Sequence, residues 1–203
     1  MEKRVVVLLL ALCLAFIEPT ACWLLRHGED DRKRTAQLIT SNGYPVERHF
    51  VTTEDSYIIT MQRIPAGREE QPADSQSRKA VVFLMSGLEG SSADYVVNLP
   101  HQSLGFILAD HGFDVWLGNV RGTKYSKHIY LNRRQRKFWN FSLDEMIAFD
   151  LPAQIDYVLL KTGQRKLQYV GWSQGCAIMF GLLAAKPQYN KRILLFHAMA
   201  PAV

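Results

Sequence analysis

The sequence predicts an α/β fold in which a mostly parallel sheet is covered by helices on both faces. Three observations predict it: an early hairpin, a continuous apolar strand, and a later alternation of strands with helices. The hairpin is expected at 47–53 and 57–61, where two strand-forming runs flank a tight turn at 54–56. The run 80–85 is apolar throughout, which is typical of a strand buried on both faces.

Strands and helices alternate after that run. Helices are expected at 30–41, 103–111, 150–160 and 174–185, and strands at 113–117, 167–170 and 193–199. Parallel strands joined by helices form a layered domain, and their crossovers are right-handed. The predicted sheet stops after its sixth strand, 193–199, whose outer edge would have no neighbour and would favour aggregation.

The first residues have the pattern of a secretory signal peptide. A basic start precedes an apolar run at 5–17, and small residues follow near Ala21 and Cys22. The run is too short to cross a bilayer comfortably, although an N-terminal membrane anchor is the alternative. We therefore expect a signal peptide at 1–22, no transmembrane segment, and a secreted or lysosomal protein. Residues 23–203 would then form the N-terminal part of one incomplete domain.

Cysteine usage and charge exclude some classes of protein. Cys13 and Cys22 belong to the predicted signal peptide or its edge, so Cys176 has no internal disulfide partner and an apolar core must hold the domain. The net charge is +5, with a basic run from Arg133 to Lys137 that we interpret as a solvated loop. No nucleic-acid-binding module accompanies it, so we expect no nucleic acid partner.

The chemistry is indicated by Gly171-Trp172-Ser173-Gln174-Gly175, between the strand at 167–170 and the helix at 174–185. A serine in a sharp strand-to-helix turn is lifted above the sheet, and the glycines Gly171 and Gly175 avoid collisions with neighbouring backbone. Ser173 is therefore the candidate nucleophile. The alternative is a glycine-rich turn with a passive serine.

A second loop agrees with this interpretation. Ser86-Gly87-Leu88 follows the buried strand at 80–85. In this architecture that loop and the residue after the nucleophile each supply one oxyanion-hole amide. The candidates are the backbone N–H groups of Leu88 and Gln174, each contributing about 3 kcal/mol to transition-state stabilisation. Taken alone, Ser86-Gly87 would be interpreted as a plain turn.

Further segments resemble the acid lipases of the gastric and lysosomal type and their invertebrate relatives, which have the α/β-hydrolase fold. The similar segments are Asn42-Gly43-Tyr44-Pro45, 53–58, 82–84, 109–119, Arg121-Gly122, Phe138-Trp139, 141–146, 150–153, Lys161-Thr162-Gly163 and the Ser173 turn. The resemblance implies a carboxylic-ester hydrolase that attacks triglycerides or cholesteryl esters at acid pH, at a lipid–water interface. It implies no cofactor.

Three departures from the family pattern stand out. The family usually has His where this chain has Ser86 and Trp172, and Trp172 is expected to pack under the turn. The catalytic Asp and His lie well downstream of the serine in this family. His197 is the single histidine after Ser173, and we interpret it as a core or strand-end residue.

Without acid and base, a serine hydroxyl is a weak nucleophile, so we expect this stretch alone to be nearly inert. We expect it to be a fragment of a lipase. The alternative function is a non-catalytic lipid-binding or interaction module derived from one.

One modification site is predicted. Asn140-Phe141-Ser142 is an N-glycosylation sequon, unless Phe141 is packed and Asn140 stays unmodified. No metal site is expected, because no His or Cys pair has ligand spacing. The sequence does not indicate the oligomeric state, the preferred lipid or the acyl length.

Overall fold

A computed structural model describes residues 34–70 and 79–202. The predicted signal peptide, 1–22, lies outside the described residues. The chain divides into two compact units, Met1–Arg34 and Thr35–Val203, and every described helix and strand belongs to the second.

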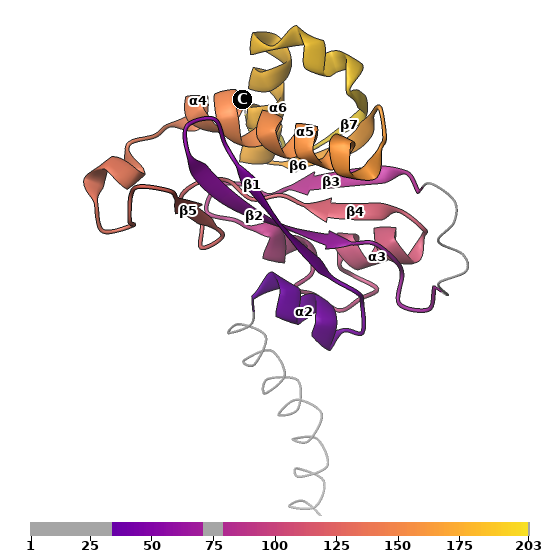
Figure 1. Cartoon of the computed structure of the whole chain (residues 1–203). Coiled ribbons are helices and arrows are strands. Elements are labelled where there is room, and N and C mark those ends of the chain that lie inside the picture. Colours follow the sequence, from indigo (N-terminus) through magenta and orange to yellow (C-terminus); the bar gives the residue numbers. More distant parts are fainter. Residues whose placement is uncertain (1–33, 71–78, 203) are drawn as a thin grey trace, which may run out of the picture. The chain divides into compact units, whose positions relative to one another are not determined.

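A seven-stranded sheet forms the centre of the second unit (Figure 1). Its order is β1-β2-β4-β3-β6-β7, with β5 paired to β2. The strands are β1 Glu47–Thr52, β2 Tyr57–Ile64, β3 Val81–Met85, β4 Asp114–Leu117, β5 Ser126–His128, β6 Leu167–Trp172 and β7 Ile193–Met199. The four strands β4, β3, β6 and β7 are parallel, while the β1–β2 hairpin is antiparallel and β2 joins β4 antiparallel. The predicted mostly parallel sheet is confirmed.

The strand β5 was not predicted. It has three residues, too few for an alternating or continuous apolar pattern to be recognised. Its pairing with β2, in which Tyr57 faces His128, holds it in place. The predicted number of six strands was therefore wrong by this one short strand.

Helices cover both faces of the sheet, as predicted. The main helices are α2 Thr35–Ser41, α3 Leu104–Asp110, α5 Leu151–Thr162 and α6 Gln174–Ala185. The short α4, Leu143–Glu145, and a π-helical turn, Met146–Asp150, lead into α5, while 3₁₀ turns lie at Ser92–Tyr95, Arg136–Trp139 and Pro187–Lys191. Helix α5 ends at Gly163, whose φ of 66° is the left-handed cap expected of a glycine after a helix.

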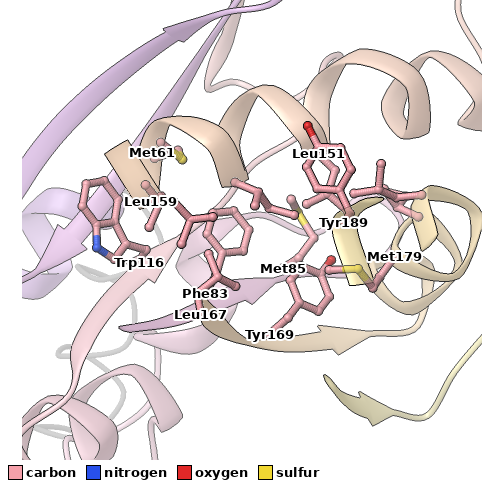
Figure 2. Packing of buried hydrophobic residues seen from close by; sticks show 14 of the residues in the cluster. Met61, Phe83, Met85, Trp116, Leu151, Leu159, Leu167, Tyr169, Met179 and Tyr189 are labelled. Atoms are coloured by element: carbon pink, nitrogen blue, oxygen red, sulfur yellow. The ribbon is translucent and has the colours of Figure 1, made fainter. Parts of the chain in front are cut away.

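The core has two parts because β3 buries both of its faces. Phe83 and Met85 pack with residues of α5 and α6 (Figure 2), whereas Val82 and Leu84 pack with residues of α2 and α3. All five residues of β3 are buried. Among the described helices, none is long and apolar enough to cross a membrane.

The strand β7 differs from the others. Among the described strands it pairs with β6 alone, and it is the one without a buried residue. Leu194 is 63% exposed and Leu195 50% exposed. His197, expected in the core or at a strand end, is exposed within β7 opposite Val170, because nothing described packs on that face of β7.

Candidate active site

Ser173 occupies the corner between β6 and α6. Its φ is 50° and its ψ −114°, a conformation that residues with a side chain rarely adopt. The strand ends at Trp172 and the helix begins at Gln174, so the direction reverses within one residue. The sharp turn predicted from the G-x-S-x-G pattern is present.

The two flanking glycines are required by close backbone contacts. A Cβ on Gly171 would lie 2.9 Å from Cys176 N and from the Gly175 backbone. A Cβ on Gly175 would overlap the carbonyl oxygen of Met85. Because backbone atoms cannot move aside as a flexible side chain can, β3, β6 and α6 meet this closely only with glycine at both positions.

Backbone hydrogen bonds fix the position of Ser173. Its N–H donates to Met199 O at 3.0 Å, and its carbonyl accepts from Cys176 N at 2.9 Å and from Ala202 N at 3.4 Å. The Ser173 residue is half-buried, and its hydroxyl has no hydrogen-bond partner among residues 34–70 and 79–202. The serine is thus held by its backbone while its Oγ stays available.

Cys176 lies beneath the turn. Its buried thiol donates to Gly171 O at 2.9 Å, and burial raises the pKa of this thiol. A raised pKa keeps the sulfur protonated, and a protonated thiol is a poor nucleophile. Cys176 therefore supports the turn and does not compete with Ser173.

The loop after β3 lies directly against the serine. A Cβ on Gly87 would be 3.1 Å from Ser173 Cβ and 3.6 Å from its Oγ. The loop is closed by a hydrogen bond from Gly90 N to Gly87 O at 3.1 Å, with Glu89 in a left-handed conformation. Gly87 brings the next residue, Leu88, beside the nucleophile.

The backbone N–H groups of Leu88 and Gln174 are both without a hydrogen-bond acceptor in the described part of the chain. Both residues line one cavity of about 650 Å³. Gln174 is the first residue of α6, where the N–H groups have no partner within the helix and the helix dipole favours negative charge. Two unpaired donors beside a serine hydroxyl form a suitable receptor for an oxyanion.

The same cavity has apolar walls. Its larger apolar lining residues are Leu88, Val120, Trp139, Phe141 and Met146. Such walls suit a hydrocarbon chain, because they bury apolar surface without leaving polar groups unpaired.

A buried ion-pair cluster supports the wall of this cavity. Arg121 lines the cavity and donates from its side chain to Asp150 at 2.7 and 2.9 Å and to Asp55 at 2.6 and 2.9 Å. Its backbone N–H also donates to Asp150, at 2.8 Å. The cluster joins the hairpin turn, the loop after β4 and the start of α5, and its guanidinium lies 4.1 Å from the ring centre of Tyr57.

The pKa values of Arg121 and Asp55 shift in the direction that favours their charged forms, whereas burial raises the pKa of Asp150. The pKa of Arg121 is raised: burial opposes the shift, but the hydrogen bonds that Arg121 donates to the two carboxylates outweigh it. The pKa of Asp55 is lowered: burial again acts in the opposite direction and is outweighed by hydrogen bonds from Arg121 and Thr53. A buried, doubly paired arginine of this kind is well suited to holding three segments in register.

No base accompanies the serine in the described residues. His49 bonds Tyr157 and Glu47, His111 bonds Ile107 O, and the ring of His128 bonds backbone N–H groups of its own loop. His197 is exposed on β7. Within residues 34–70 and 79–202, Ser173 therefore has no hydrogen-bonded histidine that could act as a general base.

Leu88 and Gln174 line one cavity, and Ser173 directly precedes Gln174 and lies against Gly87, the residue before Leu88. One expectation about the departures turns out differently: Trp172 does not pack under the turn but is exposed. Ser86 is buried. The Arg121 cluster was missed, because its members are far apart in sequence and no spacing rule connects them.

Asn140 is exposed beside the cavity wall, and the neighbouring Phe141 is half-buried against the core. Ser142, the third sequon residue, caps α4 by accepting from Asp144 N. Among the described residues no three His, Cys, Asp or Glu side chains are grouped as metal ligands.

Comparison with known proteins defines the class. Residues 80–202 match the alpha/beta hydrolase fold, and residues 35–99 match the partial alpha/beta-hydrolase lipase region. The chain belongs to the α/β-hydrolase fold family.

Within this family the similarity is to gastric and lysosomal lipases, which confirms the resemblance found in the sequence. The chain is 48% identical to the lysosomal acid lipase/cholesteryl ester hydrolase of Macaca fascicularis, over 83% of this chain and 42% of that protein. It is 42% identical to the gastric triacylglycerol lipase of Bos taurus, over 96% of this chain and 49% of that protein. The chain spans about half the length of the curated relatives it matches.

Solved structures show the same fold at low sequence identity. An esterase of Pyrococcus furiosus aligns with a TM-score of 0.55 and 18% identity, over 80% of this chain and 53% of that chain. A bacterial membrane phospholipase A aligns with a TM-score of 0.53 and 15% identity, over all of this chain and 53% of that chain.

Proposed function

We propose that the protein is a carboxylic-ester hydrolase that acts on neutral lipids, triglycerides or cholesteryl esters, with Ser173 as its nucleophile. One observation carries the proposal: Leu88 and Gln174, whose backbone N–H groups have no acceptor in the described chain, line one cavity, and Ser173, held in a strained turn, directly precedes Gln174. A binding surface alone has no need for this arrangement.

The reaction follows from the geometry. Ser173 Oγ attacks the ester carbonyl carbon, and the carbonyl oxygen takes up the negative charge that the Leu88 and Gln174 N–H groups stabilise. Collapse of this intermediate expels the alcohol and leaves an acyl-serine, which water then hydrolyses. A base must remove the Ser173 proton and return it to the leaving alcohol. In this proposal the base comes from outside the described residues.

The substrate class is supported by the apolar walls of the cavity and by the names of the relatives, which are a triacylglycerol lipase and a cholesteryl ester hydrolase. The names of the same relatives, gastric and lysosomal, support a secreted or lysosomal location. The sequence pattern supports residues 1–22 as signal peptide and 23–203 as part of one hydrolase domain. No cofactor takes part in this chemistry.

A non-catalytic lipid-binding module is the second candidate. The observation in its favour is that no described histidine contacts Ser173. In such a module the cavity would bind an acyl chain, and the serine would be unreactive.

A fluorophosphonate probe separates the two candidates. We expect slow covalent labelling of the folded chain at Ser173, abolished by Ser173→Ala and retained in Ser41→Ala, which changes an exposed serine on α2. Mass spectrometry of the labelled peptide identifies the site. A folded chain that shows no labelling at Ser173 would overturn the hydrolase proposal and leave the lipid-binding module.

We also propose Asn140 as an N-glycosylation acceptor, because its side chain is exposed in an Asn-Phe-Ser sequon. Protein secreted from animal cells should migrate faster after N-glycosidase treatment, and Asn140→Gln should remove that shift. An unmodified Asn140 in the mass spectrum of the secreted protein contradicts the assignment.

A further inference from the structure

We propose that residues 124–139, the basic loop, dock the protein on a negatively charged lipid surface. The docking itself depends on the basic loop alone. The purpose that we assign to docking, which is to bring the cavity to its substrate, rests on the proposed function. Figure 1 shows this segment projecting from the sheet beside β5.

Unbalanced positive charge is the first feature of the basic loop. No Asp or Glu occurs between Asp114 and Asp144. Within the described ranges, none of the exposed cations of the loop forms an ion pair. These exposed cations are Lys124, Lys127, Arg133, Arg134, Arg136 and Lys137.

Elsewhere in the described chain some cations form ion pairs, although others, such as Lys161, Arg165 and Lys166, do not. Arg63 pairs with Asp114, Lys79 with Glu70, and Arg121 with two carboxylates. Lys124 lies near Asp94, but the loop itself holds no carboxylate, so its other five exposed cations form a local patch of positive charge. A patch of this kind attracts an anionic membrane, where each Lys or Arg close to the surface strengthens binding roughly fivefold.

Exposed apolar side chains stand among these cations. Tyr130 is 78% exposed, and Ile129 and Trp139 are about half exposed. Tyr and Trp favour the headgroup region of a bilayer, and cations flanking apolar side chains are typical of proteins that lie on a membrane surface. The aliphatic Ile129 favours lipid over nucleic acid, since it can neither stack on a base nor pair with a phosphate.

The basic loop has a defined shape. The Arg133 guanidinium donates to Gly122 O and Thr123 O, both at 2.7 Å, and lies over the ring of Trp139. The Trp139 indole N–H donates in turn to Arg133 O at 2.6 Å. A preformed surface loses little conformational entropy on binding, which favours docking.

The basic loop also borders the cavity, because Lys124 and Trp139 line it. A membrane that contacts Tyr130 and Trp139 would face the cavity near Leu88 and Gln174. Docking by this loop therefore presents the proposed oxyanion site to the lipid.

Replacing cations of the loop with neutral residues tests the electrostatic part of the docking proposal. The triple variant Arg134→Gln/Arg136→Gln/Lys137→Gln removes three cations from the loop. Its control, Lys161→Gln/Arg165→Gln/Lys166→Gln, removes three exposed cations that precede β6, at the end of the strand opposite Ser173. Binding is measured by co-sedimentation with vesicles of phosphatidylcholine and phosphatidylserine, and with vesicles of phosphatidylcholine alone, after N-glycosidase treatment.

We expect the unmodified protein and the control to bind the anionic vesicles, and the loop variant to bind them on the order of a hundredfold more weakly. Tyr130→Ser should weaken binding more than Leu160→Ser, which changes a side chain that is 84% exposed on α5. Equal binding to neutral and anionic vesicles, or equal losses in the loop variant and the control, would overturn the proposal. So would tighter binding to a single-stranded oligonucleotide than to the anionic vesicles.

Fluorophosphonate labelling of the same samples separates this proposal from the proposed function. Vesicle binding without labelling at Ser173 supports the docking surface and contradicts the hydrolase. Labelling without selective binding to anionic vesicles supports the hydrolase and contradicts the docking surface.

Discussion

The strands β3 and β7 are almost equally apolar, yet their surroundings are opposite. β3 reads Val-Val-Phe-Leu-Met and buries all five residues, whereas β7 reads Ile-Leu-Leu-Phe-His-Ala-Met and buries none. The difference lies in their neighbours: β3 pairs with strands on both sides and has helices on both faces, while β7 pairs with β6 alone among the described strands. An apolar run thus indicates a strand, but its burial depends on what packs against it.

The largest expected effect tests this contrast directly. Phe83→Ala in β3 should cost about 3–5 kcal/mol of unfolding free energy, because it leaves a cavity in a closed core. Leu195→Ala in β7 should cost under about 1 kcal/mol, because half of that side chain is already in water. Urea unfolding measures both, and similar costs for the two variants would contradict the contrast.

The second test compares a crowded glycine with an open one. Gly175→Ala should cost about 3 kcal/mol and reduce fluorophosphonate labelling at Ser173 at least tenfold, because the new Cβ collides with Met85 O and displaces the turn. Gly112→Ala should cost about 1 kcal/mol, since its Cβ meets nothing within 4 Å and only its φ of 81° is unfavourable. Labelling should be unchanged in Gly112→Ala, and a Gly175→Ala protein that labels normally would refute the steric argument.

A third test compares Asp55, which forms an ion pair with Arg121, with its exposed neighbour Glu54. The lowered pKa of Asp55 means that its ion pair with Arg121 stabilises the fold above its ordinary value of 3.8, and that this contribution disappears as the pH falls through the lowered pKa. Asp55→Asn should cost about 2 kcal/mol at neutral pH and flatten the loss of stability below about pH 4. The exposed Glu54→Gln should leave the pH profile intact. Thermal melts across this pH range measure the stability of both variants. If Asp55→Asn had the same pH profile as the unmodified protein, the ion pair would not be the cause of the pH dependence.

The smallest expected effect is on stability at the β7 edge. Leu194→Lys should change the unfolding free energy by no more than about 0.5 kcal/mol, because Leu194 is largely exposed. It should reduce self-association, since a charge on an edge strand disfavours strand pairing between molecules. Light scattering at rising protein concentration measures this, with the exposed Leu160→Lys on α5 as control. A fall in scattering of the same size in the control would show that the edge is not responsible.

The parts of the fold that the sequence predicts are those with a local physical signature. The run that forms β3 is apolar at every position, which predicts a buried strand. The turn at Ser173 is predicted by the two flanking glycines, which close backbone contacts require in the structure. The ends of the strands were predicted less accurately than their positions: β2 was expected to end at residue 61 but continues to Ile64. That extension pairs with β4, a partner about fifty residues away, so its own residues do not reveal it.

Features that depend on distant contacts were not predictable. The strand β5 exists because of its pairing with β2, and the partners of Arg121, Asp55 and Asp150, lie far from it in sequence. His197 was expected in the core or at a strand end, because it lies at the end of the last predicted strand. It is exposed because no described residue packs on its face of β7.

The exposed strand β7 has one consequence for chemistry. Ser173 N–H donates to Met199 O at the last residue of β7, and Ala202 N–H donates back to Ser173 O. The serine's unusual φ is thus held partly by a strand that is itself the least protected in the sheet. Opening of β7 at Met199 would break the hydrogen bond from Ser173 N–H and remove one constraint on the backbone of the serine. Amide hydrogen exchange at Ser173 would report the strand's opening before any catalytic assay does.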